Sequence, residues 1–451
     1  MANQIMPISP ARVAAHEILL RVQREDSYAS ELLHSASLAE LTSTDHGLTT
    51  ELVMGVLRWR SALDSAIAGT SSRRLDKLDD EVLIALRLGA YQLGWLNRIP
   101  PRAAIHESVE LVKRARKRSA VPFTNAILRT LADSLPRRQP HVDSIIASNT
   151  PEALAIASAH PEWLVQRWST QFGFDVAREI CKHNQCVPVT AVRLRSNSAE
   201  VELQRAGIQL APGALLIDAR RVLSGDVSKT QPCQSGEIAI QDEASQLVAA
   251  LVGPGKRILD CCAAPGGKTC ALADRHPNAS LVAVELHAHR AGLLRKRVGS
   301  ENVQVVNSDI RQFPLTHPFD RVLVDAPCSG TGTVSRNPEI KWRLQPGDLS
   351  DLGSRQVSIL SAAMLHVAPQ GKLVYATCSL EKEEGESVVE EALQNHTSFH
   401  LRNVHSELER LHAQGLVTPN VVASLVDGPY LRTIPGVHPC DGFFVAILER
   451  E

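Results

Sequence analysis

The stretch RILDCCAAPGGKT, residues 257–269, carries most of the information about the fold of this chain. A short apolar run ends at Asp260, a loop of small residues follows, and a helix is expected after Lys268. The small side chains allow the backbone to approach a ligand closely, and the helix would direct its positive N-terminus at that ligand. The stretch therefore indicates an α/β fold with a binding loop at the end of a strand.

Four more apolar runs repeat this order of strand, loop and helix. They read SLVAVEL, NVQVVNSD, DRVLVDAP and GKLVYATC, at residues 280–286, 302–309, 320–327 and 371–378. Near-continuous apolar strands that alternate with helices predict a parallel, doubly wound sheet. Ligands of such sheets bind beyond the carboxyl ends of the strands, so the residues that end these runs are the candidates for a site.

The loop after the first strand differs from two common nucleotide-binding loops. A Walker A loop needs a glycine five residues before Gly267, where Cys262 stands, and the Gly-x-Gly-x-x-Gly pattern fits nowhere in the stretch. The loop is thus neither a typical phosphate-binding loop nor the usual dinucleotide turn. This argues against a nicotinamide-dependent oxidoreductase, which the sheet alone would also allow.

Acidic residues end the next three strands. Glu285 ends the second run, where an acid commonly binds the hydroxyls of a ribose, and Asp309 and Asp325 end the third and fourth. Each acid by itself is more often a helix cap or a solvated loop residue. Their repetition at strand ends favours a ligand that contains a nucleoside.

Two cysteines also follow strands. Cys328 comes after the fourth run, and Cys378 ends the fifth, just before the acidic segment at residues 380–386, which is expected to be helical. If the two strands are neighbours, both thiols open onto the same side of the cleft. A buried cysteine is ordinarily a small, inert apolar residue. That inert role is expected for Cys181, Cys186, Cys233 and Cys270.

The chain of 451 residues is too long for one compact core, so two or three domains are expected. Residues 10–135 show the three- and four-residue spacing of amphipathic helices, whereas residues 136–240 mix a helix with short alternating runs that favour strands. We therefore expect an all-helical domain at 1–140, a small α/β linking segment at 141–237 and the α/β sheet domain at 238–451.

Composition is typical of an ordinary globular protein, with 44% hydrophobic and 22% charged residues and a formal net charge of −1. Nine cysteines without a Cys-x-x-Cys pair indicate a reducing compartment, and they predict neither a structural zinc site nor another metal. No basic segment precedes an apolar one at the N-terminus, and no apolar run approaches the roughly 20 residues of a membrane span. A cytoplasmic protein without membrane contact is expected.

A basic stretch lies within residues 101–140, where nine Lys or Arg residues stand against three acids. A solvated helix face explains this excess at least as well as a nucleic-acid-binding surface does. The five cations of the basic stretch are Lys113, Arg114, Arg116, Lys117 and Arg118.

Five segments together resemble the signature set of the RNA 5-methylcytosine methyltransferases of the NOL1/NOP2/Sun family. They are CCAAPGGKT (261–269), DAPCSGTGTVSRNPEIKWR (325–343), YATCSL (375–380), IAIQDEASQLVA (238–249) and DGFFVA (441–446). Upstream, HPEWLVQRW is similar to the segment that precedes the catalytic domain in the bacterial Sun/Fmu enzymes, and RLGAYQL, IPPRAAIHESVEL and FTNAILR resemble their NusB-like RNA-binding helices. The resemblance implies a Rossmann-like catalytic domain that uses S-adenosylmethionine.

The resemblance also implies which residues hold that cofactor. The family's loop, here Cys262 to Lys268, wraps the methionine part, and the acid at Glu285 holds the ribose. The acid at Asp309 lies near the adenine, and Arg290 matches a family arginine in the same region. The cofactor-binding residues implied in this way are Cys262, Ala263, Ala264, Pro265, Gly266, Gly267, Lys268, Glu285, Arg290, Asp309 and Asp325.

The family's reaction implies roles for four residues. Carbon 5 of cytosine is a poor nucleophile, and addition of a thiolate to carbon 6 makes it enamine-like. Cys378 matches the family's nucleophile, and Cys328 matches the thiol that assists product release. Asp325 would lie beside the target base and Lys268 near the reaction centre. A cationic cofactor or Lys268 would lower the pKa of the Cys378 thiol from its ordinary value of about 8.5.

The implied substrate is a cytosine in small-subunit ribosomal RNA, naked or in an early assembly intermediate. A monomer is the default expectation for the oligomeric state. The base must leave any stacked helix to enter such a site. In this context, holding the RNA backbone becomes the favoured role for the basic stretch. The same chemistry on transfer RNA or at another ribosomal position is the alternative. A second alternative is a catalytically silent RNA-binding protein, and the intact pair Cys328 and Cys378 argues against it.

Overall fold

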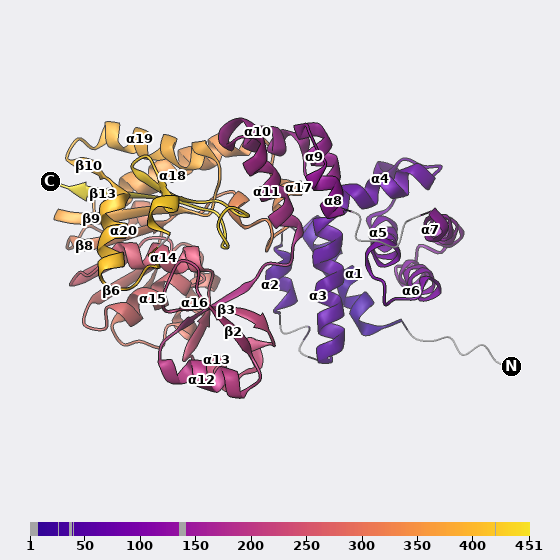
Figure 1. Ribbon diagram of the computed structural model, residues 1–451, viewed down its shortest axis with the longest axis horizontal. Helices are drawn as coiled ribbons and strands as arrows, with labels where there is room; N and C mark the ends of the chain where they lie inside the picture. Colours follow the sequence, from indigo (N-terminus) through magenta and orange to yellow (C-terminus); the bar gives the residue numbers. More distant parts are fainter. Residues whose placement is uncertain (1–7, 26, 36–37, 39, 135–140, 420) are drawn as a thin grey trace. The chain divides into compact units, whose positions relative to one another are not determined.

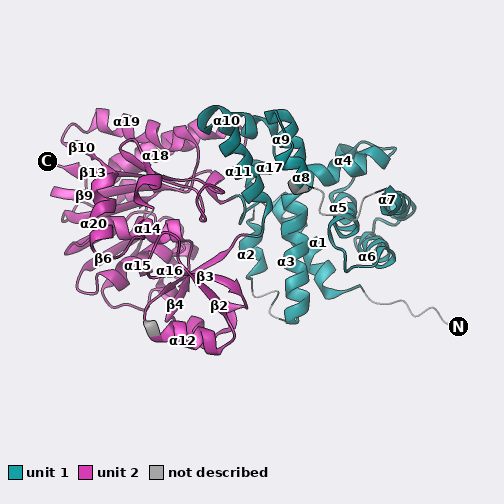
Figure 2. Ribbon diagram, viewed as in Figure 1, with its two compact units in different colours: residues 1–187, 334–343 teal, residues 188–333, 344–451 magenta. Residues whose placement is uncertain are grey.

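A computed structural model of the chain describes residues 8–25, 27–35, 38, 40–134, 141–419 and 421–451 (Figure 1). It groups into two compact units, which Figure 2 colours separately. Unit 1 comprises residues 1–187 and 334–343, and unit 2 comprises residues 188–333 and 344–451. The expected boundary at residue 140 lies outside the described residues. So do Arg137 and Arg138, two of the nine basic residues counted at 101–140.

The described part of unit 1 is helical, as the spacing of its apolar residues predicts. Its central helix, α5 (Asp80–Trp95), packs against α1, α3, α4, α6 and α7. Residues Val82 to Gly94 are all buried, and a helix that is apolar on every side belongs in a core. The other α-helices are α1 (Pro10–Arg24), α2 (Ala29–Leu33), α3 (Ser43–Arg58), α4 (Arg60–Thr70), α6 (Pro101–Arg114), α7 (Val121–Ser134), α8 (His141–Ile146), α9 (Pro151–Ala157), α10 (Glu162–Phe172), α11 (Phe174–Gln185) and α17 (Ile340–Arg343).

Residues 334–343 belong to unit 1, although unit 2 precedes and follows them in the chain. Lys341 of this segment is 1% exposed, and its Nζ donates to the carbonyl oxygens of Arg58 and Ala159 at 2.8 and 2.7 Å. Two hydrogen bonds from a buried lysine amine to backbone carbonyls fix the segment among the helices of unit 1.

Unit 2 begins with a small antiparallel sheet in the order β2-β3-β1-β4, which supplies the strands expected in the middle segment. The helices at residues 141–187, which the sequence analysis assigned to the same segment, belong to unit 1. Its elements are β1 (Thr190–Leu194), α12 (Asn197–Arg205), β2 (Gln209–Pro212), β3 (Ala219–Ser224), α13 (Gln231–Gln234) and β4 (Ile238–Ile240).

A larger sheet follows, in which the described residues give the strand order β11-β12-β13-β9-β8-β5-β6-β7, with β10 paired to β13. The five strands expected from the sequence are β5 (Arg257–Asp260), β6 (Ser280–Glu285), β7 (Val303–Asn307), β8 (Phe319–Asp325) and β9 (Val367–Thr377). They run parallel, as predicted, and β8 and β9 are neighbours. The sequence pattern did not predict the antiparallel extension by β10 (Phe399–Arg402), β11 (Val426–Asp427), β12 (Tyr430–Thr433) and β13 (Phe443–Arg450).

Helices cover both faces of this sheet (Figure 1). Along β9, Leu373 and Tyr375 belong to the core shared with α18 and α19, whereas Val374 and Ala376 belong to the core shared with α14, α15 and α20. This alternation is the two-residue period of a strand buried on both faces. The helices are α14 (Glu243–Val252), α15 (Gly267–Arg275), α16 (Ala288–Arg297), α18 (Asp348–Met364), α19 (Glu386–Asn395) and α20 (Val404–Ala413). Within the described ranges, no helix combines the length and apolar character that crossing a bilayer requires.

Candidate active site

The loop between β5 and α15 brings the backbone close to the carboxyl edge of the sheet. Gly266 adopts a φ of +100°, in the left-handed region that favours glycine, and a Cβ there would lie 2.6 Å from the side chain of Leu294. Cys262 lies in the same loop, and burial raises the pKa of its thiol, so it remains protonated and unreactive. The predicted loop therefore contributes backbone and small side chains rather than a nucleophile.

Asp260, the last residue of β5, was placed at a strand end by the sequence but was given no role there. It is 1% exposed and accepts a hydrogen bond from Thr269 Oγ1 at 2.7 Å. Burial raises the pKa of its carboxyl to about 7. The available signal was its place at the end of a strand, the same signal that singled out Glu285.

Glu285 ends β6 and is buried with its carboxylate held in place. Its Oε1 accepts from the backbone N–H of His287 at 2.9 Å, and its Oε2 accepts from the backbone N–H of Ala264 at 3.3 Å. The second bond ties the strand end to the loop that follows β5. Since a carboxylate offers about four acceptor positions, others remain for a ligand.

Asp309 follows β7 and forms the cap of a short turn. It accepts from the backbone N–H of Arg311 at 3.0 Å, and its Oδ2 lies 2.5 Å from the guanidinium of the same residue. These hydrogen bonds lower the pKa of the Asp309 carboxyl. The carboxylate is therefore already neutralised by a neighbour along the chain.

Lys268 and Asp325 form an ion pair between the start of α15 and the end of β8. Nζ of Lys268 donates to Oδ2 of Asp325 at 2.7 Å and lies 4.9 Å from the centre of the Phe443 ring. Burial works to lower the pKa of Lys268, but the Asp325 carboxylate outweighs it, so the pKa is raised. Lys268 is thus an ammonium group and not a base at neutral pH.

Cys328 and Cys378 lie at the ends of neighbouring strands with their Sγ atoms 3.3 Å apart. The sequence expectation that both thiols open onto the same side thus matches the geometry. The hydrogen bond to Cys378 and burial raise the pKa of Cys328 well above its ordinary value. Cys328 therefore keeps its proton, and either sulfur can be the donor in this contact.

Comparisons with known proteins assign the family. Residues 250–449 match the family model described as 16S rRNA methyltransferase RsmB/F, and residues 9–133 match the NusB family. A Bacillus subtilis relative, a probable ribosomal RNA small subunit methyltransferase B, is 34% identical over 99% of this chain and 100% of its own. The chain belongs to the RsmB/F methyltransferase family.

One further relative supports this assignment to the RsmB/F family, and one solved structure shares the fold. The ribosomal RNA small subunit methyltransferase B of Vibrio cholerae is 30% identical over 98% of both chains. The crystal structure of PH0851 superimposes with a TM-score of 0.79, at 23% identity, and covers 99% of this chain and 100% of that one. At that identity the match shows the fold alone.

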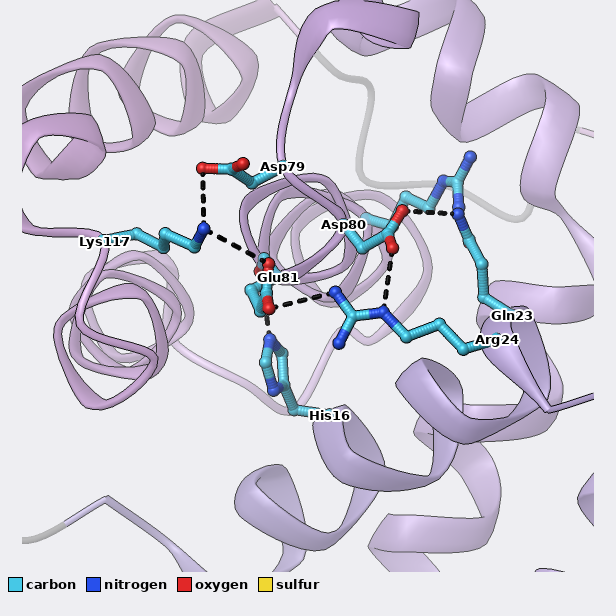
Figure 3. Close-up of polar contacts among 8 residues, drawn as sticks. His16, Gln23, Arg24, Asp79, Asp80, Glu81 and Lys117 are labelled. Atoms are coloured by element: carbon cyan, nitrogen blue, oxygen red, sulfur yellow. Dashed lines mark hydrogen bonds and ion pairs between the residues drawn. The ribbon is translucent and has the colours of Figure 1, made fainter.

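The cations predicted to bind RNA in this RsmB/F family member have acidic neighbours. Three of the five form ion pairs: Lys113 with Glu110 at 2.6 Å, Arg114 with Glu17 at 3.3 Å, and Lys117 with Asp79 at 3.1 Å. Figure 3 shows Lys117 between Asp79 and Glu81. Arg116 and Arg118 are exposed, as is Arg290 on α16 in unit 2. The basic stretch therefore presents less net positive charge than its sequence indicates.

Proposed function

We propose that this protein methylates carbon 5 of a cytosine in small-subunit ribosomal RNA, with S-adenosylmethionine as the methyl donor and Cys378 as a covalent nucleophile. The observation that supports this most is the contact between the two thiols, 3.3 Å apart, near the Lys268–Asp325 ion pair. A reaction in which one thiol adds to a ring and another assists its release needs two thiols close to each other, and these two are in contact. The names of the Bacillus and Vibrio relatives support the same class of substrate.

The residues beyond β5 and β6 fit the proposed cofactor. A Cβ at Gly266 would meet the side chain of Leu294, so the loop needs glycine there, and Glu285 keeps acceptor positions suited to two ribose hydroxyls. We assign the methionine part to Cys262 through Lys268 and the adenine to the region of Asp309. S-adenosylmethionine would supply an electrophilic methyl group there.

Cys378 would begin the reaction by forming a bond from its Sγ to carbon 6 of the cytosine. The ring electron pair then moves to carbon 5, which becomes nucleophilic enough to take the methyl group. The thiolate is the reactive form of cysteine. The S–H group of Cys328, 3.3 Å away, would stabilise that thiolate by donating to it.

Asp325 and Lys268 would act on the ring. A carboxylate that shares a proton with ring nitrogen N3 stabilises the charge that develops as the thiolate adds. Lys268 holds Asp325 in place by their ion pair at 2.7 Å. Because its pKa is raised, Lys268 is assigned to orientation and charge balance rather than to proton abstraction.

Product release would reverse the first bond. After methyl transfer a base removes the proton from carbon 5, the electrons re-form the ring double bond, and Cys378 leaves as a thiolate. The protonated Cys328 would donate to the departing sulfur and lower the barrier to its departure. The two cysteines thus have different duties: Cys378 bonds to the ring, and Cys328 donates to its sulfur whenever that sulfur is a thiolate.

The helical unit would hold the ribosomal RNA. Residues 9–133 match the NusB family, and we propose that exposed cations of this unit, Arg116 and Arg118 among them, contact RNA phosphates. The target cytosine must be unstacked to reach a thiol at a strand end, which favours a loop or a locally opened helix.

Bisulfite sequencing of ribosomal and transfer RNA, from cells with and without this gene, tests the proposal. Loss of protection at one cytosine of small-subunit rRNA in the deletion strain is the expected result. Loss at a transfer RNA position instead would keep the chemistry and refute the substrate. No change at any cytosine would favour a silent RNA-binding protein.

A further inference from the structure

A buried carboxylate, that of Glu384, lies behind the two cysteines of unit 2. It is 0% exposed, and its Oε2 accepts from the hydroxyls of Ser329 and Ser379, each at 2.5 Å. Its Oε1 accepts from the backbone N–H of Ser329 at 2.8 Å. Ser329 directly follows Cys328, and Ser379 directly follows Cys378. One side chain therefore holds the two cysteine-bearing turns at once.

Glu384 is itself held from two elements of the sheet domain. Gln356 of α18 is fully buried, and its Nε2 donates both to Glu384 Oε1 and to the carbonyl oxygen of Pro327, each at 2.9 Å. The hydroxyl of Tyr375 in β9 donates to the Glu384 carbonyl oxygen at 2.8 Å. The carboxylate thus accepts four hydrogen bonds, which is about its full capacity.

Further hydrogen bonds join the same two turns. The backbone N–H of Gly332 donates to the Cys378 carbonyl oxygen at 2.9 Å. The backbone N–H of Leu380 donates to Thr331 Oγ1 at 2.9 Å. The turns after β8 and β9 therefore form one hydrogen-bonded unit with the Glu384 carboxylate at its centre.

We propose that Glu384 is a positioning residue that ties the Cys328 turn to the Cys378 turn and so holds their sulfur atoms in contact. The inference rests on the proposed function, because it gives the thiol spacing a purpose. A thiol is a weak hydrogen-bond donor and acceptor, so the contact between the two sulfurs cannot by itself hold two loops. Charge-assisted bonds to a buried carboxylate are short and strong enough to do so.

The negative charge of Glu384 has a second effect. It contributes to the raised pKa of Cys328, after the hydrogen bond to Cys378 and burial. The same side chain would therefore keep the sulfurs together and keep the proton on Cys328. A group that only stabilises the fold would not alter the protonation of that thiol.

Phenylarsine oxide provides a test that does not depend on methyl transfer. Its arsenic forms two As–S bonds with a pair of adjacent thiols and releases its oxygen as water, and mass spectrometry of digested full-length protein would identify Cys328 and Cys378 as the bridged pair. We expect Glu384→Ala to weaken this capture by about tenfold or more, because it lowers the effective concentration of one thiol near the other. Unchanged capture in Glu384→Ala would overturn the proposal.

Turnover provides the second readout, with matched controls. We expect kcat for RNA methylation to fall about 100-fold in Glu384→Ala with little change in KM, because displacement of reacting groups acts on chemistry more than on binding. Glu386→Gln is the control. Glu386 stands two residues after Glu384 in the chain, and its carboxylate pairs with Arg432 of β12. It should keep wild-type capture and kcat. A fall in both readouts as large as that of Glu384→Ala would refute a specific role for Glu384.

Two milder variants keep the test decisive if Glu384→Ala does not fold. Glu384→Gln retains one acceptor oxygen for the Ser329 N–H, and the serine hydroxyls can turn to accept from the new amide. Its capture and kcat should therefore lie between those of wild type and Ser379→Ala. Wild-type values in both variants would overturn the proposal. Normal arsenical capture without methylation by any form would refute the proposed function and leave the positioning role standing.

Discussion

Cys328→Ala should trap the enzyme on its RNA. The substitution removes the S–H group that lies 3.3 Å from the Cys378 sulfur, while the nucleophile and its backbone stay in place. Addition and methyl transfer can still occur, but the departing thiolate loses its hydrogen-bond donor.

The geometry sets the size of this effect. A hydrogen bond to a charged group contributes about 1.5–3 kcal/mol. Since 1.4 kcal/mol corresponds to a factor of ten, release should slow by roughly 10- to 150-fold. Because release then becomes slower than addition, a covalent protein–RNA complex should accumulate during turnover.

Denaturing gel electrophoresis measures this complex directly. Purified full-length Cys328→Ala, incubated with S-adenosylmethionine and small-subunit rRNA, should give a slowly migrating band that protease removes. Cys378→Ala should give neither band nor product, and Cys328→Ser, which keeps an O–H donor on a shorter bond, should release faster than Cys328→Ala. Wild-type release by Cys328→Ala, with no trapped complex, would refute the assignment of the two thiols.

Three other outcomes follow from buried or paired charges. Asp325→Asn should destabilise the protein by about 3 kcal/mol, because it leaves the Lys268 ammonium buried without its partner; an unchanged urea midpoint at about pH 8 would contradict this. Burial lowers the pKa of Lys341, so folding disfavours its proton at any pH below the unfolded value of about 10.4. As the pH falls from about 10 to about 7, the Tm of the wild type should therefore decrease relative to that of Lys341→Met. A Tm difference that stays constant over this range would refute the sign. Each cation that neutralises a phosphate of single-stranded RNA contributes about 0.7 to the slope of log Kd against log salt. Replacing the five cations at residues 113–118 by Gln should reduce this slope by about 1.4, the value for two cations, rather than by about 3.5, the value for five, because three of them already pair with carboxylates. An unaltered slope would exclude the basic stretch from the RNA contact.

Apolar runs that end in polar residues predicted most of the site. Glu285, Asp325 and Cys378 could be placed together because parallel strands end at one edge of a sheet, whichever helices connect them. The prediction needed β8 and β9 to be neighbours, and they are. The same reasoning did not reach β13, which pairs antiparallel with β9, because nothing in a local pattern reports where a strand will pair.

Glu384 shows why other parts could not be predicted. It stands in an acidic segment that the sequence predicts to be helical, and the four glutamates of residues 380–386 look equivalent there. Only the folded chain shows that Glu384 binds both cysteine turns, since its partners Ser329 and Gln356 are 55 and 28 residues away. Burial of a charge depends on distant donors, and these leave no local mark in the sequence.

The position of residues 334–343 has a consequence for dissecting this protein into fragments. A fragment cut at the boundary between residues 187 and 188 would hold every helix of unit 1 except α17. The carbonyl oxygens of Arg58 and Ala159 would lose their buried donor, and the complementary fragment would carry Lys341 without its acceptors. The two units are thus interleaved along the gene, and a helical module supplied as a separate polypeptide would be complete only with the decapeptide encoded more than 140 residues downstream.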